Sequence, residues 1–402
     1  HQHAPNSPVL QELQRLVRTA LDENRDLRRA ISSVEEFQSR LFISRMDFAP
    51  QMSATAYAPS VKNSSFAFPG FPNPFNYYLQ GNLTWELDIW GRIRRSNEAA
   101  RADLLSKEES RRAVVLQLVS GVAEAYFDLL QFDMQLQIAR ETVKSWEESV
   151  RIAQARLRQG MTNKLDLDQF ESERANAVAR TAELERLMVQ KENQISVLLG
   201  HTPKQIPRGR SLTEQVIPPE VPPGLPSDLL QRRPDIVQAE RQLAAATARI
   251  GMAKADRFPK VSLTGLLGIA NPQITNLFTP GSDFAALGPT ITGPLLNAQI
   301  LGFQQEAAEA LARQSLAEYE QSVLVAFREV EDALVAVRTV RDQRQAQIQR
   351  VDALRSAFKL AELRYKGGLA SYLDVLVARR TLFQAELSLT DTHRLHLVSI
   401  VL

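Results

Sequence analysis

Few side chains in this sequence have the types and the spacing that chemistry requires. Among the five histidines, His393 and His396 lie three residues apart, which places both on one face of a helix. A metal site needs more than two ligands, and neither a thiolate nor a cluster of carboxylates accompanies this pair. We therefore interpret both histidines as solvated or packed side chains.

The sequence also lacks the loops that bind phosphate or expose a nucleophile. No glycine-rich phosphate loop follows an expected strand, and no nucleophile elbow occurs. Cysteine is absent, which excludes disulfides and thiolate chemistry. We expect no catalytic residue, no cofactor and no metal ion, and hence a protein that is not an enzyme.

Composition narrows the function further. The 48 basic and 46 acidic side chains leave a net charge of +2, which gives no support for binding nucleic acid. No uninterrupted run of 18 apolar residues occurs, so we expect no membrane-spanning helix. The first residues lack the apolar core of a signal peptide, and we expect any export signal to lie upstream.

Two glycine-containing phrases show that the chain is duplicated. Residues 156–166 resemble residues 364–374, and Gly160 and Gly368 stand at matching places, 208 positions apart. Further matches with almost the same offset follow in the same order along the chain: Asp26 with Asp235, and Glu98 with Glu306. The pattern indicates a tandem duplication of a unit of about 200 residues, far longer than a solenoid repeat.

A very long helix dominates each unit. Between Val115 and Leu157 apolar residues alternate at spacings of three and four, which is typical of a coiled coil. A helix over about 95–159 would be about 100 Å long. Gly160 interrupts it, so we expect a tight tip at 159–163 and a return helix over 165–199.

Strands are expected between the helices. Residues 77–88 alternate apolar with polar side chains, and further strands are expected at 51–58, 260–268 and 284–295, where Pro289 suggests an edge or a bulge. Their lengths suit a tilted strand that crosses a bilayer, although a soluble hairpin packed on a helix remains an alternative. Four strands cannot close a membrane barrel, so a spanning sheet requires several chains. The expected membrane-facing residues are Leu79, Leu83, Trp85, Leu287 and Ile291.

The expected organisation is two repeats and a connector. The first repeat covers 1–200, and a proline-rich extended connector covers 201–226. The second repeat covers 227–402. Within it we expect helices over about 298–366, a tip at 367–371 and a return helix over 373–402.

The order of these elements and four sequence phrases resemble the outer membrane factor family of TolC-like efflux channels. The match is nearest to the lipoprotein branch that serves resistance–nodulation–division pumps. The phrases are Trp-Glu-Leu-Asp-Ile-Trp-Gly-Arg at 85–92, Pro-Arg-Gly-Arg-Ser-Leu at 207–212, Leu-Pro-Ser-Asp-Leu-Leu-Gln-Arg-Arg-Pro-Asp at 225–235 and Arg-Tyr-Lys-Gly-Gly-Leu at 364–369.

The resemblance implies a mainly α-helical protein with a β part that works as a homotrimer. Three chains with four strands each would form a 12-stranded barrel in the outer membrane of a Gram-negative bacterium, in contact with its lipid. Their helices would form a coiled-coil tunnel through the periplasm. The implied partners are a periplasmic adaptor protein and an inner-membrane pump of the resistance–nodulation–division type. A lipid anchor is expected on a cysteine upstream of the given chain, and the chain is expected to continue beyond Leu402.

The resemblance also assigns the two tips to the adaptor. A glycine turn leaves backbone open to a partner helix, although a turn glycine with positive φ needs no partner to explain it. The residues implied in adaptor contact are Gly160, Met161, Thr162, Asn163, Gly367, Gly368, Leu369, Ala370 and Ser371.

A constriction of the tunnel is implied just past the second tip, at Leu373, Val377 and Arg380, with Asp374 beside them. Family members often carry Asp where this chain has Val377. We expect three copies of Leu373 to form an apolar constriction. Ion pairs of Asp374, Asp166 or Arg380 between helices would hold it shut, each worth about 0–1 kcal/mol.

These features predict an outer membrane channel of a tripartite efflux pump that gives drugs or other small toxic compounds a passive exit. Two alternatives remain at this point. One is an exit duct for type I protein secretion, and the other is a soluble coiled-coil scaffold.

Overall fold

The structure is a computed structural model that describes residues 11–58, 77–215, 232–294 and 298–401. Several features expected from the sequence lie outside these residues. They are the first ten residues, the loop at 59–76, the connector from 216 onward, the first part of the phrase at 225–235, the end of the strand expected to reach 295, and Leu402.

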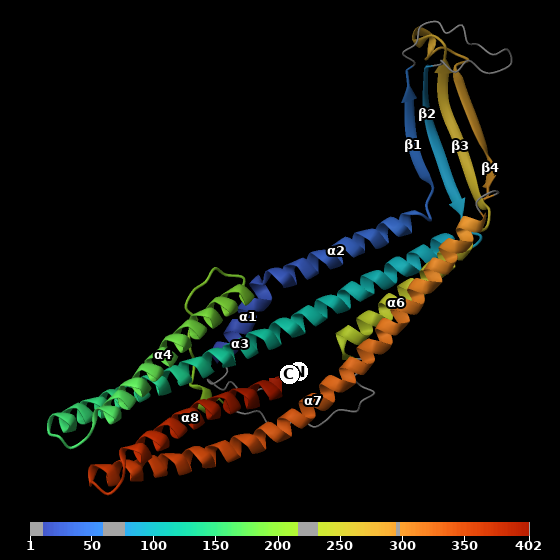
Figure 1. Cartoon of the computed structure of the whole chain (residues 1–402). Coiled ribbons are helices and arrows are strands. Elements are labelled where there is room, and N and C mark those ends of the chain that lie inside the picture. The colour runs from blue at the N-terminus through green and yellow to red at the C-terminus, as the bar shows by residue number, and fades with distance from the viewer. Residues whose placement is uncertain (1–10, 59–76, 216–231, 295–297, 402) are drawn as a thin grey trace. The chain divides into compact units, whose positions relative to one another are not determined.

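Long helices and four strands make up the described chain (Figure 1). The elements in order are α1 (Gln11–Glu23), α2 (Arg25–Met46), β1 (Gln51–Tyr57), β2 (Tyr77–Leu87), α3 (Arg92–Arg158), α4 (Lys164–Leu198), the 3-10 helix η1 (Leu212–Glu214), α6 (Pro234–Ala255), β3 (Lys260–Asn271), the 3-10 helix η2 (Ile274–Asn276), β4 (Asp283–Thr292), α7 (Ala298–Lys366) and α8 (Tyr372–Val401).

The chain divides into two compact units, and each draws segments from both sequence repeats. One unit contains residues 1–29, 112–229 and 325–402, with the helical hairpins and their tips. The other contains residues 30–111 and 230–324, with the sheet and the helices that lead into it. The expected repeats are therefore not separate compact bodies.

The four strands form one antiparallel sheet in the order β1-β2-β3-β4 (Figure 1). The register runs without a break, from the pair Gln51–Thr84 to the pair Lys260–Thr292. Pro289 lies in β4, at an edge of the chain's own sheet and without a bulge, opposite Leu263. Of the two explanations offered for this proline, the edge position is the one observed.

Two boundaries of the sheet differ by three residues from those expected, and the others lie within one residue. β3 continues to Asn271, past the expected end at 268, because Ile269, Ala270 and Asn271 pair with the first residues of β2. β4 ends at Thr292 instead of reaching 295. Gly268, the expected last residue, lies within the ladder, paired with Gln80 and Phe284. A Cβ there would lie 2.5 Å from the carbonyl oxygen of Leu79.

The long helix α3 begins three residues earlier than predicted because Asp88 caps it. Its carboxylate accepts the backbone N–H groups of Ile93 at 2.8 Å and Arg94 at 2.9 Å. These donors have no partner inside the helix, and an acidic acceptor at this end also suits the helix dipole. The same helix buries the predicted apolar stripe, including Val122, Leu129 and Ala139.

A buried asparagine separates α1 from α2. The Asn24 side chain accepts the backbone N–H of Leu27 at 2.9 Å and donates to the carbonyl of Leu198 at 2.9 Å. It therefore caps α2 and fastens the helix start to the end of α4. Gly200 follows α4 with φ +76°, and a Cβ at this position would lie 2.3 Å from the carbonyl oxygen of Glu23.

The close approach at Gly200 generates a stability prediction. Gly200→Ala should destabilise the protein by about 1–3 kcal/mol, because alanine strains a positive φ and its Cβ meets backbone that cannot yield. Gly121→Ala is the matched control, since a Cβ in this α3 position meets nothing within 4 Å. It should stabilise by about 0.5–1 kcal/mol. Thermal denaturation of both variants checks this, and equal shifts would contradict it.

Candidate functional site

The two helical tips have the same turn geometry, at positions 208 apart (Figure 1). Gly160 has φ 70° and Gly368 has φ 73°. After Gly160, Met161 N–H donates to the carbonyl of Arg156 at 2.9 Å, and after Gly368, Leu369 N–H donates to that of Arg364 at 2.8 Å. This is the bonding of a helix that ends in a left-handed residue. The glycines are explained by their φ, since a Cβ at either would meet nothing within 4 Å.

Both tips expose an apolar side chain next to the glycine. Met161 is 66% exposed and Leu369 is 75% exposed, at matching positions of the two phrases. Gly160, Asn163, Gly367 and Ser371 are exposed as well, whereas Thr162 and Ala370 are partly covered. The structure thus gathers each set of predicted tip residues at one turn. Its contact with an adaptor stays a prediction.

Side chains at the two tips cap the return helices, and the aspartates that close the two phrases take part in different ways. Asn163 accepts the N–H of Asp166 at 2.9 Å, and Asp166 accepts the hydroxyl of Thr162. At the second tip, Asp374 accepts the N–H and the hydroxyl of Ser371, each at 3.1 Å. Within the described part of this single chain neither aspartate forms an ion pair with Arg380. Asn163 caps α4, whereas Ser371 and Asp374 form a reciprocal capping box at the start of α8.

The predicted constriction residues lie along one exposed face of α8. Leu373 is 57% exposed and Val377 is 42% exposed, and Arg380 follows on the same face at helical spacing. The opposite face packs inward through Tyr372, Val375 and Leu376. An exposed apolar stripe at this place is consistent with a surface that meets other chains or lines a passage.

An aromatic cluster holds the start of α8 against the first hairpin. Phe170 of α4 lies between Trp146 of α3 and Tyr372 of α8, with ring centroids 5.9 Å and 4.2 Å away. Burial raises the pKa of the Tyr372 hydroxyl, which has no hydrogen-bond partner among the described residues. This cluster is therefore held by packing, without polar contacts from Tyr372.

Arg379 is a functional candidate that the sequence did not indicate. Its guanidinium lies 4.9 Å from the ring centres of both Trp146 and Phe358, so it joins α8 to α3 and α7. It also makes a polar contact, with the Ser149 hydroxyl at 3.4 Å. Burial lowers the pKa of Arg379 to about 10, which leaves it charged at neutral pH. Trp146 stood in the predicted stripe, but no spacing rule pairs it with an arginine on a distant helix.

Charged groups fasten the later part of α8 to the first hairpin. Arg394 contacts Asp128 and, at 3.0 Å, Glu124 of α3, while Lys191 of α4 reaches Asp128 at 2.9 Å. One turn away, Asp391 accepts the amide of Gln135 at 2.8 Å. Burial raises the pKa of Asp391, although the Gln135 hydrogen bond opposes this shift.

The histidine pair is packed, as the sequence predicted. His396 is buried, and His393 accepts the Nε–H of Arg344 at 3.3 Å. Burial, with the charge of Arg344, lowers the pKa of His393 to about 4 and lowers the pKa of His396. Within the described residues no group of three or more His, Asp or Glu side chains could hold a metal ion.

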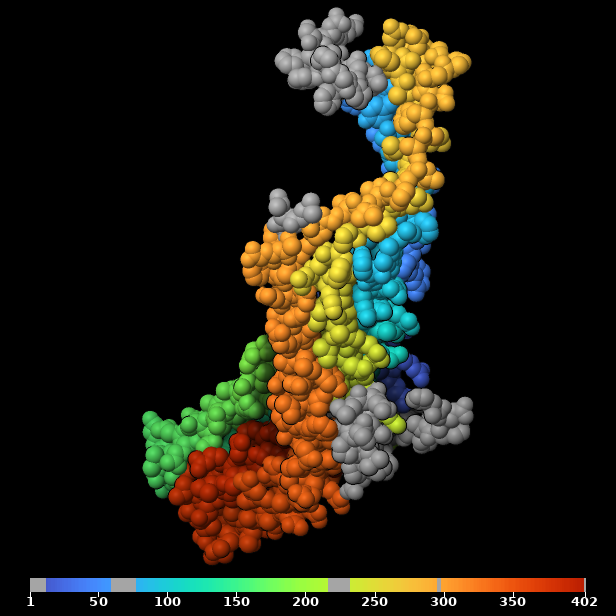
Figure 2. Space-filling model, turned by 90° about the vertical axis from the view of Figure 1, so that its right-hand side faces the viewer, coloured from blue at the N-terminus to red at the C-terminus, as the bar shows by residue number. Residues whose placement is uncertain are grey.

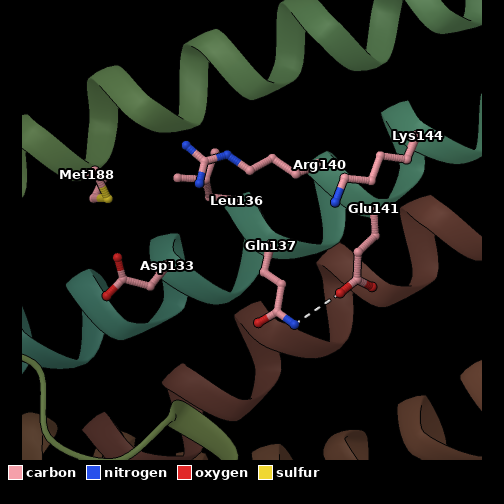
Figure 3. A pocket seen from close by; sticks show the side chains of 7 residues that line it. All are labelled: Asp133, Leu136, Gln137, Arg140, Glu141, Lys144 and Met188. Carbon is pink, nitrogen blue, oxygen red and sulfur yellow. Dashed lines mark hydrogen bonds between the residues drawn. The ribbon is translucent and has the colours of Figure 1, made fainter. Parts of the chain in front are cut away.

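The hollows on the helical hairpin do not resemble an active site. Figure 3 shows one that Met188 of α4 shares with six residues of α3. Gln137 donates to Glu141 at 3.0 Å, and Arg140 pairs with Glu185 at 2.7 Å. The charged groups satisfy one another along the helix surface instead of converging on one point. The geometry is that of a solvated helix face.

Strand pairing places the five predicted membrane-facing residues on one face of the sheet. Cross-strand partners share a face, so Leu83 and Leu287, both paired with Gly265, lie on the same side. Leu79, Trp85 and Ile291 belong to that side by alternation. Its paired positions carry apolar residues along most of the sheet. Contact with lipid stays a prediction.

Within the described chain, one helix contains a stretch that could cross a membrane by length and composition alone. An 18-residue window of Arg92–Arg158 has a mean hydropathy of 1.5, and 44% of it is buried inside the protein. The sequence prediction excluded such a helix because it counted uninterrupted apolar runs. The buried part matches the core of a helical bundle, so this finding alone carries no membrane assignment.

Comparison with known proteins gives matches across nearly the whole chain. The family described as outer membrane efflux protein matches residues 16–201 and 225–395. A probable outer membrane lipoprotein of Salmonella typhimurium, SilC, is 34% identical over 94% of this chain and 82% of its own length. The toluene efflux pump outer membrane protein TtgC of Pseudomonas putida is 35% identical over 94% and 78%. A membrane protein of Pseudomonas aeruginosa has a similar structure, with a TM-score of 0.89 and 32% identity over 97% and 92% of the two chains.

The contacts of Arg379 predict that replacing it lowers the protection of the start of α8 against hydrogen exchange. Arg379→Met should raise the hydrogen exchange rates of the α8 residues 372–380 by about tenfold. It removes two cation–π contacts worth about 0.5–2 kcal/mol each, and tenfold corresponds to about 1.4 kcal/mol. Exchange measured by mass spectrometry checks this.

Arg380→Met is the matched control, because it changes the same residue type one position along, on the exposed face. It should leave exchange in this segment near that of the unchanged protein. Equal protection in both variants would contradict a clamping role for Arg379.

Proposed function

The chain belongs to the outer membrane efflux protein family, and from this membership we propose that it is the exit duct of a tripartite efflux pump. It resides in the outer membrane of a Gram-negative bacterium and extends into the periplasm. Three copies assemble, and they work with a periplasmic adaptor and an inner-membrane pump. Its sheet contributes four strands to a shared barrel and its hairpins contribute to a helical tunnel.

One observation supports the proposal of an exit duct most directly. The sheet has an apolar face, a polar face and two edges without a neighbour among the described strands. An apolar outside and a polar inside are what a membrane barrel with a water-filled passage requires. β2, β3 and β4 have 10–12 residues, enough for a tilted strand to cross the bilayer.

The passage is passive. Energy comes from the pump, and the described residues supply no constellation for catalysis. We further propose that the pump is of the resistance–nodulation–division type, that the two tips bind the adaptor, and that an upstream lipid anchor holds the protein. The name of SilC as a probable outer membrane lipoprotein supports the lipid anchor, and the name of TtgC as a probable efflux pump outer membrane protein supports a role beside a pump. The pump type and the adaptor contact at the tips rest on the sequence resemblance.

A deletion strain tests the function. The strain should become more susceptible to small toxic compounds, including apolar solvents, and this chain should restore resistance when it is returned on a plasmid. Detergent-extracted protein should run as a trimer. A protein that stays in the soluble fraction and restores nothing would refute the duct and favour the scaffold, whereas loss of a secreted protein would favour the secretion duct.

The gate proposal yields a second experiment. We propose that three copies of Leu373 narrow the tunnel near the second tip, beside Val377 and Arg380. Leu373→Ser should raise the conductance of channels in planar bilayers several-fold, because a polar side chain wets a constriction that leucine keeps dry. Asp374→Ala should raise it less, since it removes a helix cap worth about 1 kcal/mol.

Leu369→Ser is the matched control for the gate. It replaces another highly exposed leucine, four residues earlier and in the turn itself. Channels with Leu369→Ser should keep a small conductance even if binding of the adaptor to the tip weakens. Unchanged small conductance in both Leu373→Ser and Asp374→Ala would reject the gate.

A further inference from the structure

The water-facing side of the sheet has its own polar ladder. Asn82 of β2 donates to the Thr55 hydroxyl of β1 at 3.2 Å, and the hydroxyls of Thr264 and Thr290 lie 2.7 Å apart between β3 and β4. By alternation this face is opposite to Leu79 and Trp85. We call it the luminal face; its residues are 51, 53, 55, 57, 78, 80, 82, 84, 86, 260, 262, 264, 266, 268, 270, 284, 286, 288, 290 and 292.

Charge is confined to the helix end of the luminal face. Glu86 and Lys260 are its charged residues in the described strands. Glu86 is paired with Arg92 at 2.8 Å, and Lys260 lies 3.6 Å from Asp256. Farther from the helices, the luminal face carries amides, hydroxyls and apolar groups. Beyond Glu86 and Lys260, a molecule on this path therefore meets no charged side chain from these strands.

Toward its outer end, near the loops, the luminal face gains aromatic and aliphatic side chains beside the hydroxyl of Thr55 and the amide of Gln80. Figure 2 shows the sheet at the top of the view. Tyr57 and Tyr78 stack there, with ring centroids 5.3 Å apart and an interplanar angle of 22°. We call this end the outer luminal patch: Tyr57, Tyr78, Leu266, Ala270, Phe284 and Ala286. Tyr57 is 43% exposed and Leu266 is 41% exposed.

Small residues leave the aromatic rings accessible. Ala270 is the partner of Tyr78 and Gly268 is the partner of Phe284, so the β3 positions between the rings carry at most a methyl group. The sheet separates this patch from the lipid-facing side, so in the assembled duct the patch faces the aqueous passage. Aromatic faces bind flat apolar groups by stacking, which requires no charge on the bound molecule.

We propose that the outer luminal patch is a transient binding site for flat, uncharged aromatic molecules as they leave the duct. This inference rests on the proposed function, because only a duct brings exported molecules past this face. Three copies of the patch, one from each chain, surround the passage. Binding at this patch is weak, because each chain offers a stacked ring pair and no charged group that would hold the molecule. Weak binding allows the molecule to leave the duct.

Caffeine tests the site because it is flat, uncharged, aromatic and water-soluble. Caffeine is added to planar bilayers that hold the wild-type trimer, on the side of the loops that join β1 to β2 and β3 to β4. Myo-inositol, an uncharged solute of similar size, serves as the comparison. Caffeine should reduce the current in a saturable way, and myo-inositol should not. The caffeine concentration that gives half of the maximal effect should rise about five- to tenfold when both Tyr57→Ser and Tyr78→Ser are introduced, because about 1 kcal/mol of ring stacking is lost.

Two further variants control the result. Tyr77→Ser removes the neighbouring tyrosine on the opposite face, and it should leave the caffeine titration unchanged. Tyr78→Phe retains the ring and should behave like the wild type, which separates stacking from the hydroxyl. A wild-type protein that forms no channel would overturn the proposed function. A conducting wild type whose caffeine titration is unaffected by the double change, or that responds equally to myo-inositol, would overturn the binding site alone.

Discussion

The two unpaired edges of the four-stranded sheet determine how this protein has to assemble. β1 and β4 each have one neighbour among the described strands, so each carries a row of unpaired backbone groups. In a bilayer no water can satisfy these groups, and each one left unpaired costs several kcal/mol. Four strands cannot curl onto themselves, because the smallest membrane barrels need about eight. Closure therefore has to come from other copies of the chain, β4 of one copy pairing with β1 of the next.

The sequence duplication also explains how three chains can build a closed helical tunnel. Each repeat supplies one hairpin and one pair of strands, and three chains then give six similar hairpins around one axis. The tips are built alike by local rules: a left-handed glycine ends one helix, and a side-chain cap starts the next. The return helices after the tips differ. Leu373 of α8 and Leu165 of α4 are both exposed at matching positions. Arg379 of α8, however, lies over two aromatic rings, whereas the matching position of α4 is Glu171.

Local and periodic signals predicted most of the fold. The heptad stripe placed α3, α4 and their tip within a few residues, and period-two alternation identified the strands and their apolar face. The failures came from partners distant in sequence. Ile269 and Ala270 joined β3 because β2 was present to pair with them.

The candidate site was predicted only in part, for the same reason. The glycine tips were identifiable because both copies carry the same phrase. Asp166 accepts the hydroxyl of Thr162 and Asp374 accepts the backbone N–H of Ser371, local contacts that spacing alone does not reveal. The ion pairs expected between helices stay a prediction. Arg379 depends on rings from two other helices, and no single-segment pattern encodes such a contact.

The two ends of α8 are held by different kinds of force. Near its end, Arg394, Asp128 and Lys191 form directional charge-assisted hydrogen bonds that break if the helix shifts by a few ångströms. Near its start, Tyr372 packs on Phe170 and Arg379 lies over Trp146, and these contacts depend weakly on direction. A helix anchored firmly at one end and held by stacked surfaces at the other can move most easily at the stacked end. Because Leu373 and Val377 lie at that end, the part of α8 best suited to narrow a passage is also the part that is easiest to displace.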